Sequence, residues 1–121
     1  MARILLIEDH RDLLENTIEL LELEGHEVHC AVNGIDGISK AKEVLPDIIL
    51  CDVWMPGATG VEVIVELKKD AVTASIPFVF VSASVEKKDI EAALQLGANG
   101  YVNKPYEAEI LFAEIARCLK Q

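Results

Sequence analysis

Short, nearly continuous apolar runs alternate along the chain with longer segments in which apolar residues recur at helical spacing. The runs occupy residues 3–8, 27–32, 47–51, 76–82 and 100–103. They lack the regular polar alternation of a strand with one solvated face. They therefore predict the strands of a parallel sheet that is covered on both faces.

The segments between these runs predict helices. Gly25 follows the first helix, over residues 10–24, and Pro46 ends the second, which opens at residues 33–37. The expected inward-facing residues, helix by helix, are Leu14, Ile18 and Leu21; Ile38, Ala41 and Leu45; Val63, Ile64 and Leu67; Ile90, Ala93, Leu94 and Gly97; and Leu111, Ile115, Cys118 and Leu119. Repetition of a strand–helix unit predicts an α/β domain with a five-stranded parallel sheet and right-handed connections.

Length and composition agree with one globular domain. Hydrophobic residues make up 51% of the 121 residues and charged residues 26%, a balance typical of folded proteins. No apolar run reaches the roughly 18 residues of a membrane span, so we expect a soluble, cytoplasmic protein. The formal net charge of -10, without a cluster of Lys and Arg, argues against direct binding of nucleic acid.

The three cysteines have no spacing that indicates a disulfide pair or a metal site. Cys30 and Cys51 lie in strand-like runs, and Cys118 lies on the expected inner face of the last helix. We therefore expect buried free thiols in a reducing compartment.

Polar residues collect where the predicted strands end. Glu8 and Asp9 close the first strand, Asp52 closes the third, Ser82 closes the fourth, and Lys104 follows the fifth. In an open parallel sheet, ligands bind in the crevice at the carboxyl ends of the strands. If the first, third and fourth strands are neighbours, three carboxylates, a hydroxyl and an ammonium group share one small crevice.

Carboxylates crowded in one crevice repel one another, so either one is protonated or a cation lies among them. All the candidate ligands are oxygen atoms, which favours Mg²⁺ over zinc. An aspartate that stays free to attack beside such an ion can accept a phosphoryl group. The ion and Lys104 would neutralise the transferred oxygens, which is most of what phosphoryl transfer requires.

Four stretches of the sequence together resemble the receiver domain of two-component response regulators. They are Glu8-Asp9, CDVWMPGATG, FVFVSA and GANGYVNKPY. Each is weak alone, but together they follow the order of that family, which includes chemotaxis regulators. The resemblance covers the whole chain. It implies a receiver domain over residues 1–121 with the flavodoxin-like, doubly wound (βα)5 fold and the strand order 2-1-3-4-5.

The resemblance also implies roles for the acidic residues. Asp52 matches the phosphoacceptor of the family, and Asp9 matches its direct Mg²⁺ ligand. Glu8 stands where the family usually has a second aspartate, which often contacts the metal through a water molecule. Asp52 and the main-chain carbonyl of Trp54 complete the expected metal ligands. The turn at residues 55–57 would keep Asp52 accessible.

The remaining site residues are implied in the same way. Ser82 matches the hydroxyl that bonds the phosphoryl group, and Lys104 matches the invariant lysine. Tyr101 matches the aromatic residue that moves with Ser82 on activation. Trp54 and Ser84 match rim positions that influence how water reaches the acyl phosphate.

A phosphorylation-activated switch, rather than an enzyme with an external substrate, is the function that the resemblance implies. The donor would be a sensor histidine kinase or a histidine phosphotransfer protein. The chain would catalyse only its own phosphorylation and dephosphorylation, and would control a downstream protein or an output domain outside this sequence. The face expected to change comprises the fourth helix, fifth strand and fifth helix, around Ile90, Tyr101 and Leu111.

Other functions stay open from the sequence. Haloacid-dehalogenase-like phosphatases also combine a strand-end aspartate, a hydroxyl, a lysine and Mg²⁺, but they need a general acid where this chain has Trp54. A degenerate receiver that only binds partners would lack the acid or the lysine, and this chain keeps both. Gly100 replaces the acidic residue that winged-helix DNA-binding regulators often carry there, which weakly disfavours their dimer pattern.

Overall fold

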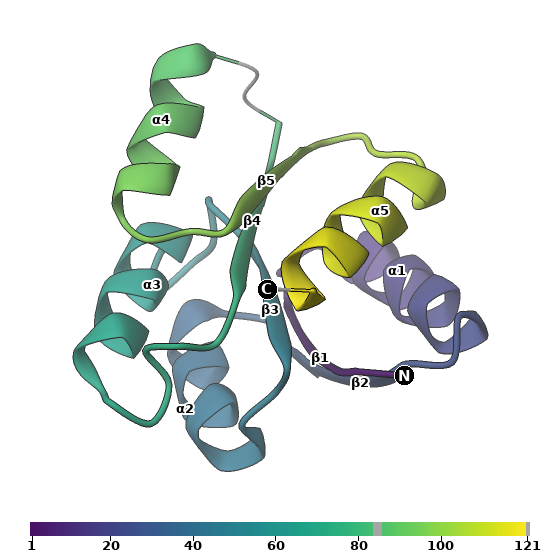
Figure 1. Cartoon of the computed structure of the whole chain (residues 1–121), viewed down its shortest axis with the longest axis horizontal. Coiled ribbons are helices and arrows are strands. Elements are labelled where there is room, and N and C mark those ends of the chain that lie inside the picture. Colours follow the sequence, from purple (N-terminus) through teal and green to yellow (C-terminus); the bar gives the residue numbers. More distant parts are fainter. Residues whose placement is uncertain (84–85, 121) are drawn as a thin grey trace.

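A five-stranded parallel sheet with the order β2-β1-β3-β4-β5 forms the centre of the molecule. The computed structural model describes residues 1–83 and 86–120. The strands are β1 (Arg3–Ile7), β2 (Glu27–Ala31), β3 (Ile48–Asp52), β4 (Phe78–Ser82) and β5 (Gly100–Asn103). The predicted (βα)5 fold and strand order are confirmed, and Figure 1 shows the sheet between its helices.

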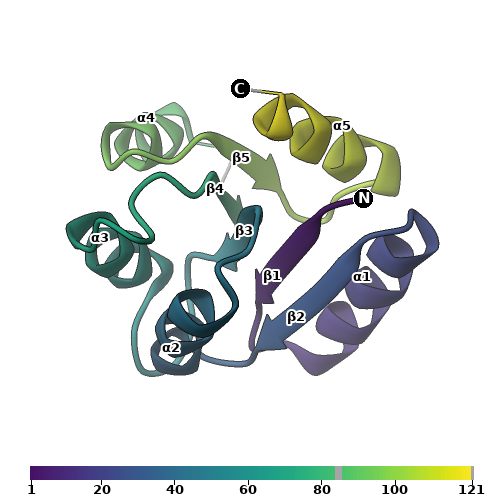
Figure 2. The same ribbon diagram turned by 60° about the horizontal axis from the view of Figure 1, so that its bottom comes forward.

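Helices cover both faces of this sheet. They are α1 (Arg11–Leu23), α2 (Gly34–Val44), α3 (Gly60–Lys69), α4 (Lys87–Gln95) and α5 (Ala108–Leu119). Figure 2 shows α1 and α5 on one side and α2, α3 and α4 on the other. Each side has its own apolar cluster because successive strand residues point to opposite faces. Within β4, for example, Phe80 packs with the second group and Val81 with the first.

The central strands explain the continuous apolar runs of the sequence. Every residue of β3 and β4 is buried, including the polar residues that end them, Asp52 and Ser82. A strand without a solvated face gains nothing from alternating polar positions. As a result, β3 and β4, in which every residue is buried, each end in a polar side chain at the carboxyl edge of the sheet.

Three inward-facing predictions are wrong: Leu45, Leu94 and Gly97. Leu45 is 45% exposed and caps α2 in a left-handed conformation, because a residue that precedes a proline is disfavoured in a helix. Leu94 is 48% exposed, and Gly97 lies beyond the end of α4, whose only buried residue is Ala93.

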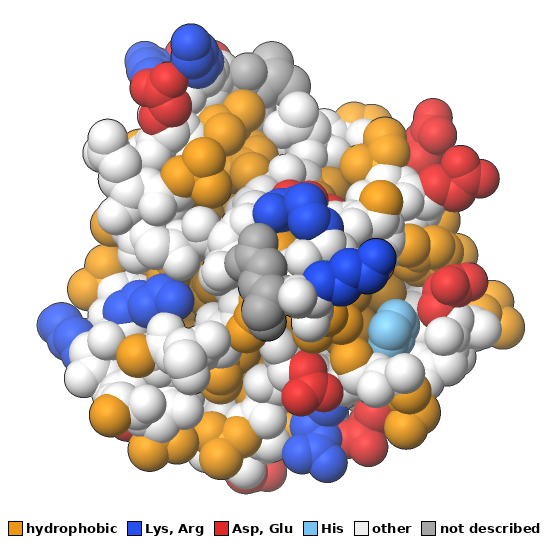
Figure 3. All heavy atoms as spheres, in the orientation of Figure 1, with side chains coloured by type: hydrophobic (Ala, Val, Ile, Leu, Met, Phe, Trp, Pro, Cys, Tyr) orange, Lys and Arg blue, Asp and Glu red, His pale blue; other side chains and the backbone are white. Residues whose placement is uncertain are grey.

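The prediction that all three cysteines are buried is wrong for one of them. Cys30 is exposed, because β2 is an edge strand, whereas Cys51 and Cys118 are buried free thiols as predicted. On the face drawn in Figure 3, Lys and Arg side chains stand among acidic and apolar ones. Over the described residues, no helix is long and apolar enough to cross a bilayer.

Candidate functional site

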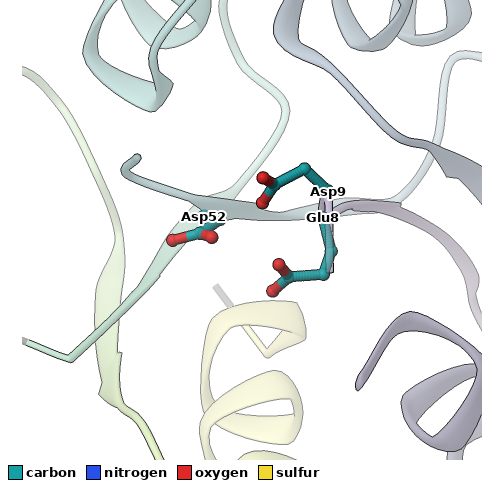
Figure 4. A group of neighbouring side chains, drawn as sticks. All are labelled: Glu8, Asp9 and Asp52. Carbon is teal, nitrogen blue, oxygen red and sulfur yellow. The ribbon is translucent and has the colours of Figure 1, made fainter. Parts of the chain in front are cut away.

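Three carboxylates meet at the carboxyl ends of β1 and β3. Ile7 and Cys51 are partners in the parallel register, so the residues that follow them, Glu8 and Asp52, leave the sheet side by side. One carboxylate oxygen from each of Glu8, Asp9 and Asp52 lies within 4.8 Å of the others. Figure 4 shows the three side chains converging on one point. Glu8 and Asp52 are buried, and Asp9 is exposed.

Lys104 brings a positive charge to the same point from the loop after β5. Its Nζ donates to Glu8 Oε1 at 2.6 Å and to Asp52 Oδ2 at 3.1 Å. Its backbone N–H donates to the carbonyl of Ser82 at 2.7 Å, which ties the loop to the end of β4. The ammonium therefore joins the acids of two different strands.

Burial controls the electrostatics of this cluster. It raises the pKa of Glu8, and the neighbouring charge of Asp52 adds to that effect, while hydrogen bonds from Lys104 and from the His10 N–H oppose it. Burial alone would lower the pKa of Lys104, but its bonds to Glu8 and Asp52 outweigh burial and raise that pKa. Lys104 is thus held as a cation.

The turn after β3 keeps Asp52 at the edge of the sheet. The Trp54 N–H donates to Asp52 Oδ1 at 3.4 Å, and Gly57 has a positive φ of 77°. A capping box between Thr59 and Glu62 then starts α3. A Cβ atom on Gly60 would lie 2.4 Å from the carbonyl oxygen of Asp52, so only glycine permits the helix to begin this close.

Beside this cluster, a pocket of about 220 Å³ opens on the side of α3 and α4. Ser82 lines it with Trp54, whose side chain is 74% exposed. Phe80 also lines it and pairs in register with Tyr101 on β5, so Phe80, Ser82 and Tyr101 share this face of the sheet. The other rim prediction, Ser84, lies outside the described residues.

Two contacts near the site were not anticipated from the sequence. The His10 N–H donates to Glu8 Oε2 at 3.1 Å, and the hydroxyls of Thr17 and Tyr106 lie 2.5 Å apart. Helical spacing could have pointed to Thr17, because it lies one turn from both Leu14 and Leu21 on the inner face of α1. The Lys104–Pro105 peptide bond is cis.

The family model for the response regulator receiver domain matches residues 4–116 of this chain. The chain belongs to the response regulator receiver domain family. Receiver domains act as switches in phosphorylation-dependent two-component signalling. The family match therefore favours the receiver interpretation over the phosphatase alternative.

Individual relatives agree with this assignment. Protein PilH of Pseudomonas aeruginosa is 36% identical over 115 residues, which make up 95% of this chain and 95% of that protein. Other curated relatives are transcriptional regulatory proteins, and the chain spans about half of their length, at 52%.

Solved receiver structures superpose closely on this chain. The chemotaxis protein CheY4 of Vibrio cholerae has a TM-score of 0.92 and 25% identity, covering 98% of both chains. The receiver domain of the sensor histidine kinase PA1611 from Pseudomonas aeruginosa has a TM-score of 0.91 and 26% identity, covering 99% of this chain and 98% of that one. The PA1611 receiver holds a magnesium ion in its active-site cleft.

Proposed function

We propose that residues 1–121 form one receiver domain in which Asp52 accepts a phosphoryl group. The donor is a phosphohistidine of a sensor histidine kinase or a histidine phosphotransfer protein. The observation that carries this proposal is the carboxylate of Asp52 at the end of a central strand, 3.1 Å from Lys104 and beside Glu8 and Asp9. The phosphorylated domain then controls a downstream protein or an output domain.

The transfer itself needs little covalent machinery. A carboxylate oxygen of Asp52 forms a new bond to phosphorus, and the bond from phosphorus to the donor imidazole nitrogen breaks with its electron pair left on nitrogen. Lys104 is in reach to neutralise charge on the transferred oxygens, since it already contacts Asp52. The chain acts on its own side chain rather than on an external substrate.

The donor set of this site fits Mg²⁺. Glu8, Asp9 and Asp52 supply oxygen atoms close enough for one ion, and hard oxygen donors are those that Mg²⁺ prefers. Asp9 and Asp52 would hold the ion with the main-chain carbonyl of Trp54, and Glu8 would assist. When bound, Mg²⁺ screens the carboxylates and the incoming phosphoryl oxygens from one another. The magnesium ion of the PA1611 receiver supports this assignment.

Ser82 and Tyr101 are the proposed switch. The hydroxyl of Ser82 would bond a phosphoryl oxygen on Asp52, because Ser82 follows Val81, the register partner of Asp52. The half-buried ring of Tyr101 lies on the same face of the sheet as the pocket beside Ser82. Movement of Ser82 toward Asp52 would let Tyr101 turn inward toward that space, a shift between two pre-existing states.

The face formed by α4, β5 and α5 is the proposed contact for the partner. It lies toward the viewer in Figure 1, and Figure 3 shows apolar side chains gathered beside α4 there. Ile90 and Tyr101 are half-buried on this face. Leu111 is fully buried, so it supports the face from the core and does not contact a partner directly.

Labelling with a small phosphodonor tests the proposed function. Incubation with acetyl phosphate and Mg²⁺ should add the mass of one phosphoryl group to the wild-type chain. Asp52→Asn should abolish that shift, because an amide is not a nucleophile. An Asp52→Asn variant that labels at the wild-type rate would refute the acceptor assignment. A wild-type chain that never labels would instead indicate a pure binding module.

A further inference from the structure

A hydrogen bond between Thr17 and Tyr106 joins α1 to the loop after β5, two parts of the chain that are far apart in the sequence. Their hydroxyl oxygens are 2.5 Å apart, and 89 positions separate the residues in the sequence. Thr17 lies in the middle of α1 and is only 1% exposed. The ring of Tyr106 packs against the apolar cluster under α1 and α5. The contact is therefore a polar link between α1 and the loop after β5, buried on the Thr17 side and half-buried on the Tyr106 side.

The position of this link in the chain relates it to Lys104. On the N-terminal side, the backbone N–H of Lys104 is bonded to the Ser82 carbonyl. On the C-terminal side, Tyr106 follows after only one residue and is bonded to α1. Lys104 thus lies between two fixed points, and its ammonium reaches both Glu8 and Asp52 from there.

The other end of the link leads back to the acids. Helix α1 begins at Arg11, directly after the loop that carries Glu8 and Asp9. The His10 N–H, just ahead of α1, donates to the Glu8 carboxylate. Thr17 therefore belongs to the helix that is continuous with the acid pair, and its bond fixes the lysine loop relative to that pair.

We propose that Tyr106 is a positioning residue that, through Thr17, sets the ammonium of Lys104 between Glu8 and Asp52. A buried hydroxyl without a partner is unfavourable, so the loop is held where both hydroxyls are satisfied. Small displacements of a charged group relative to reacting atoms slow chemistry strongly. The consequence for phosphoryl transfer rests on the proposed function, whereas the placement of Lys104 does not.

The two hydroxyls can be removed separately without removing the packing. Tyr106→Phe keeps the ring, and Thr17→Val keeps the branched shape. Thr73→Val is the matched control, because Thr73 is also 1% exposed and its hydroxyl donates to the Leu67 carbonyl at 2.7 Å, in the loop after α3. Both test variants and the control lose a hydrogen bond of a buried threonine, but only the test variants lose one that is linked to Lys104.

Two measurements are made on each variant. The first is the ¹H–¹⁵N signal of the Lys104 ammonium without divalent ions, and the second is the rate of labelling by acetyl phosphate at saturating donor and Mg²⁺. Tyr106→Phe and Thr17→Val should each move the Lys104 signal toward that of a free lysine and slow labelling about tenfold. Thr73→Val should do neither. In a Lys104→Ala background, Tyr106→Phe should slow labelling no further.

The outcomes separate this inference from the proposed function. A wild-type chain that does not label overturns the proposed function, and the Lys104 signal then still tests the placement of the ammonium. Labelling of Tyr106→Phe as fast as that of Thr73→Val overturns the positioning role. An unmoved Lys104 signal, or an equal loss of rate with and without Lys104, overturns it as well.

Discussion

Both carboxylate oxygens of Glu8 have partners within the protein. Oε1 accepts from Lys104, and Oε2 accepts from the His10 N–H. Asp9 is exposed by contrast, so its carboxylate is available to a cation without breaking an internal contact. At the scale of single residues, Glu8 is thus already engaged by Lys104 and His10, and under the proposed Mg²⁺ site Asp9 is expected to be the more direct ligand.

Metal binding should therefore respond unequally to the two acids. Asp9→Ala is expected to weaken Mg²⁺ binding by more than about tenfold, and Glu8→Ala by less, since supporting residues contribute less than direct ligands. Fluorescence of the single tryptophan, Trp54, during Mg²⁺ titration provides the measurement. Glu66→Ala, which removes an exposed acid on α3, is the control and should bind as wild type. Equal labelling with and without a chelator would contradict the metal assignment altogether.

Trp54 should lengthen the lifetime of the acyl phosphate. Its indole is 74% exposed and lines the pocket next to Ser82, where its bulk would limit in-line attack by water. Trp54→Asn is expected to speed hydrolysis several-fold, measured as loss of label after the donor is removed. Val72→Asn removes another exposed apolar side chain, 61% exposed and away from this pocket, and should leave the lifetime unchanged. A lifetime that stays the same or increases in Trp54→Asn would contradict shielding.

At the scale of elements, the start of α3 packs directly against the backbone of Asp52. The Gly60 N–H donates to the Val53 carbonyl at 2.8 Å, and the missing side chain of Gly60 lets the helix approach the end of β3. The capping box of Thr59 fixes the same end of the helix. A displaced α3 would therefore disturb Asp52, the proposed phosphoacceptor, as well as the core.

Gly60→Ala should both destabilise the fold and slow labelling of Asp52. The new methyl group would meet main-chain atoms of Asp52 and Val53, so unfolding should become easier by about 1–3 kcal/mol. Gly25→Ala is the matched control: its φ of +89° is unfavourable for alanine, by about 1–2 kcal/mol, but no atom lies within 4 Å of the added carbon. Both variants should lose stability in thermal unfolding, and only Gly60→Ala should label more slowly. Normal labelling of a destabilised Gly60→Ala would show that α3 does not control the site.

The sequence pattern predicted the strands because a strand buried on both faces of the sheet is a continuous apolar run in the sequence. It predicted the helices from the apolar residues that recur at helical spacing between these runs. It failed where a helix is only partly covered. Leu94 has the spacing of a core residue, yet α4 buries only Ala93. Periodicity reports which residues share a face, and it does not report how closely that face is packed. Cys30 shows the same limit for an edge strand.

The candidate site was predictable to the extent that strand ends determine it. The register of the parallel sheet brings Glu8 and Asp52 together whatever their side chains do. Side-chain pairing beyond the sheet was not predictable, because the loop after β5 can reach several partners in principle. The bonds of Lys104 to Glu8 and of Tyr106 to Thr17 depend on where that loop folds in three dimensions.

At the scale of the whole molecule, β4 and β5 connect the acidic cluster to the α4-β5-α5 face, where we propose that the partner binds. Ser82 at the end of β4 pairs with Asn103, and Phe80 pairs with Tyr101. The N–H of Tyr101 also donates to Glu114 Oε2 on α5 at 3.2 Å. A displacement that begins at Ser82 can therefore reach both β5 and α5 through bonded neighbours.

A phosphoryl mimic can test whether Ser82 couples the acidic cluster to Tyr101 and α4. Binding of beryllofluoride, a phosphoryl mimic, should shift the amide signals of Tyr101 and of α4 in the wild-type chain, because the mimic draws the Ser82 hydroxyl toward Asp52. Ser82→Ala removes that hydroxyl, so the signals around Asp52 should still move while those of Tyr101 and α4 move much less. Thr73→Val, which also loses a buried hydroxyl, should respond as wild type. If Ser82→Ala keeps the full response at Tyr101, coupling runs through other residues, such as the turn that leads from Asp52 to α3.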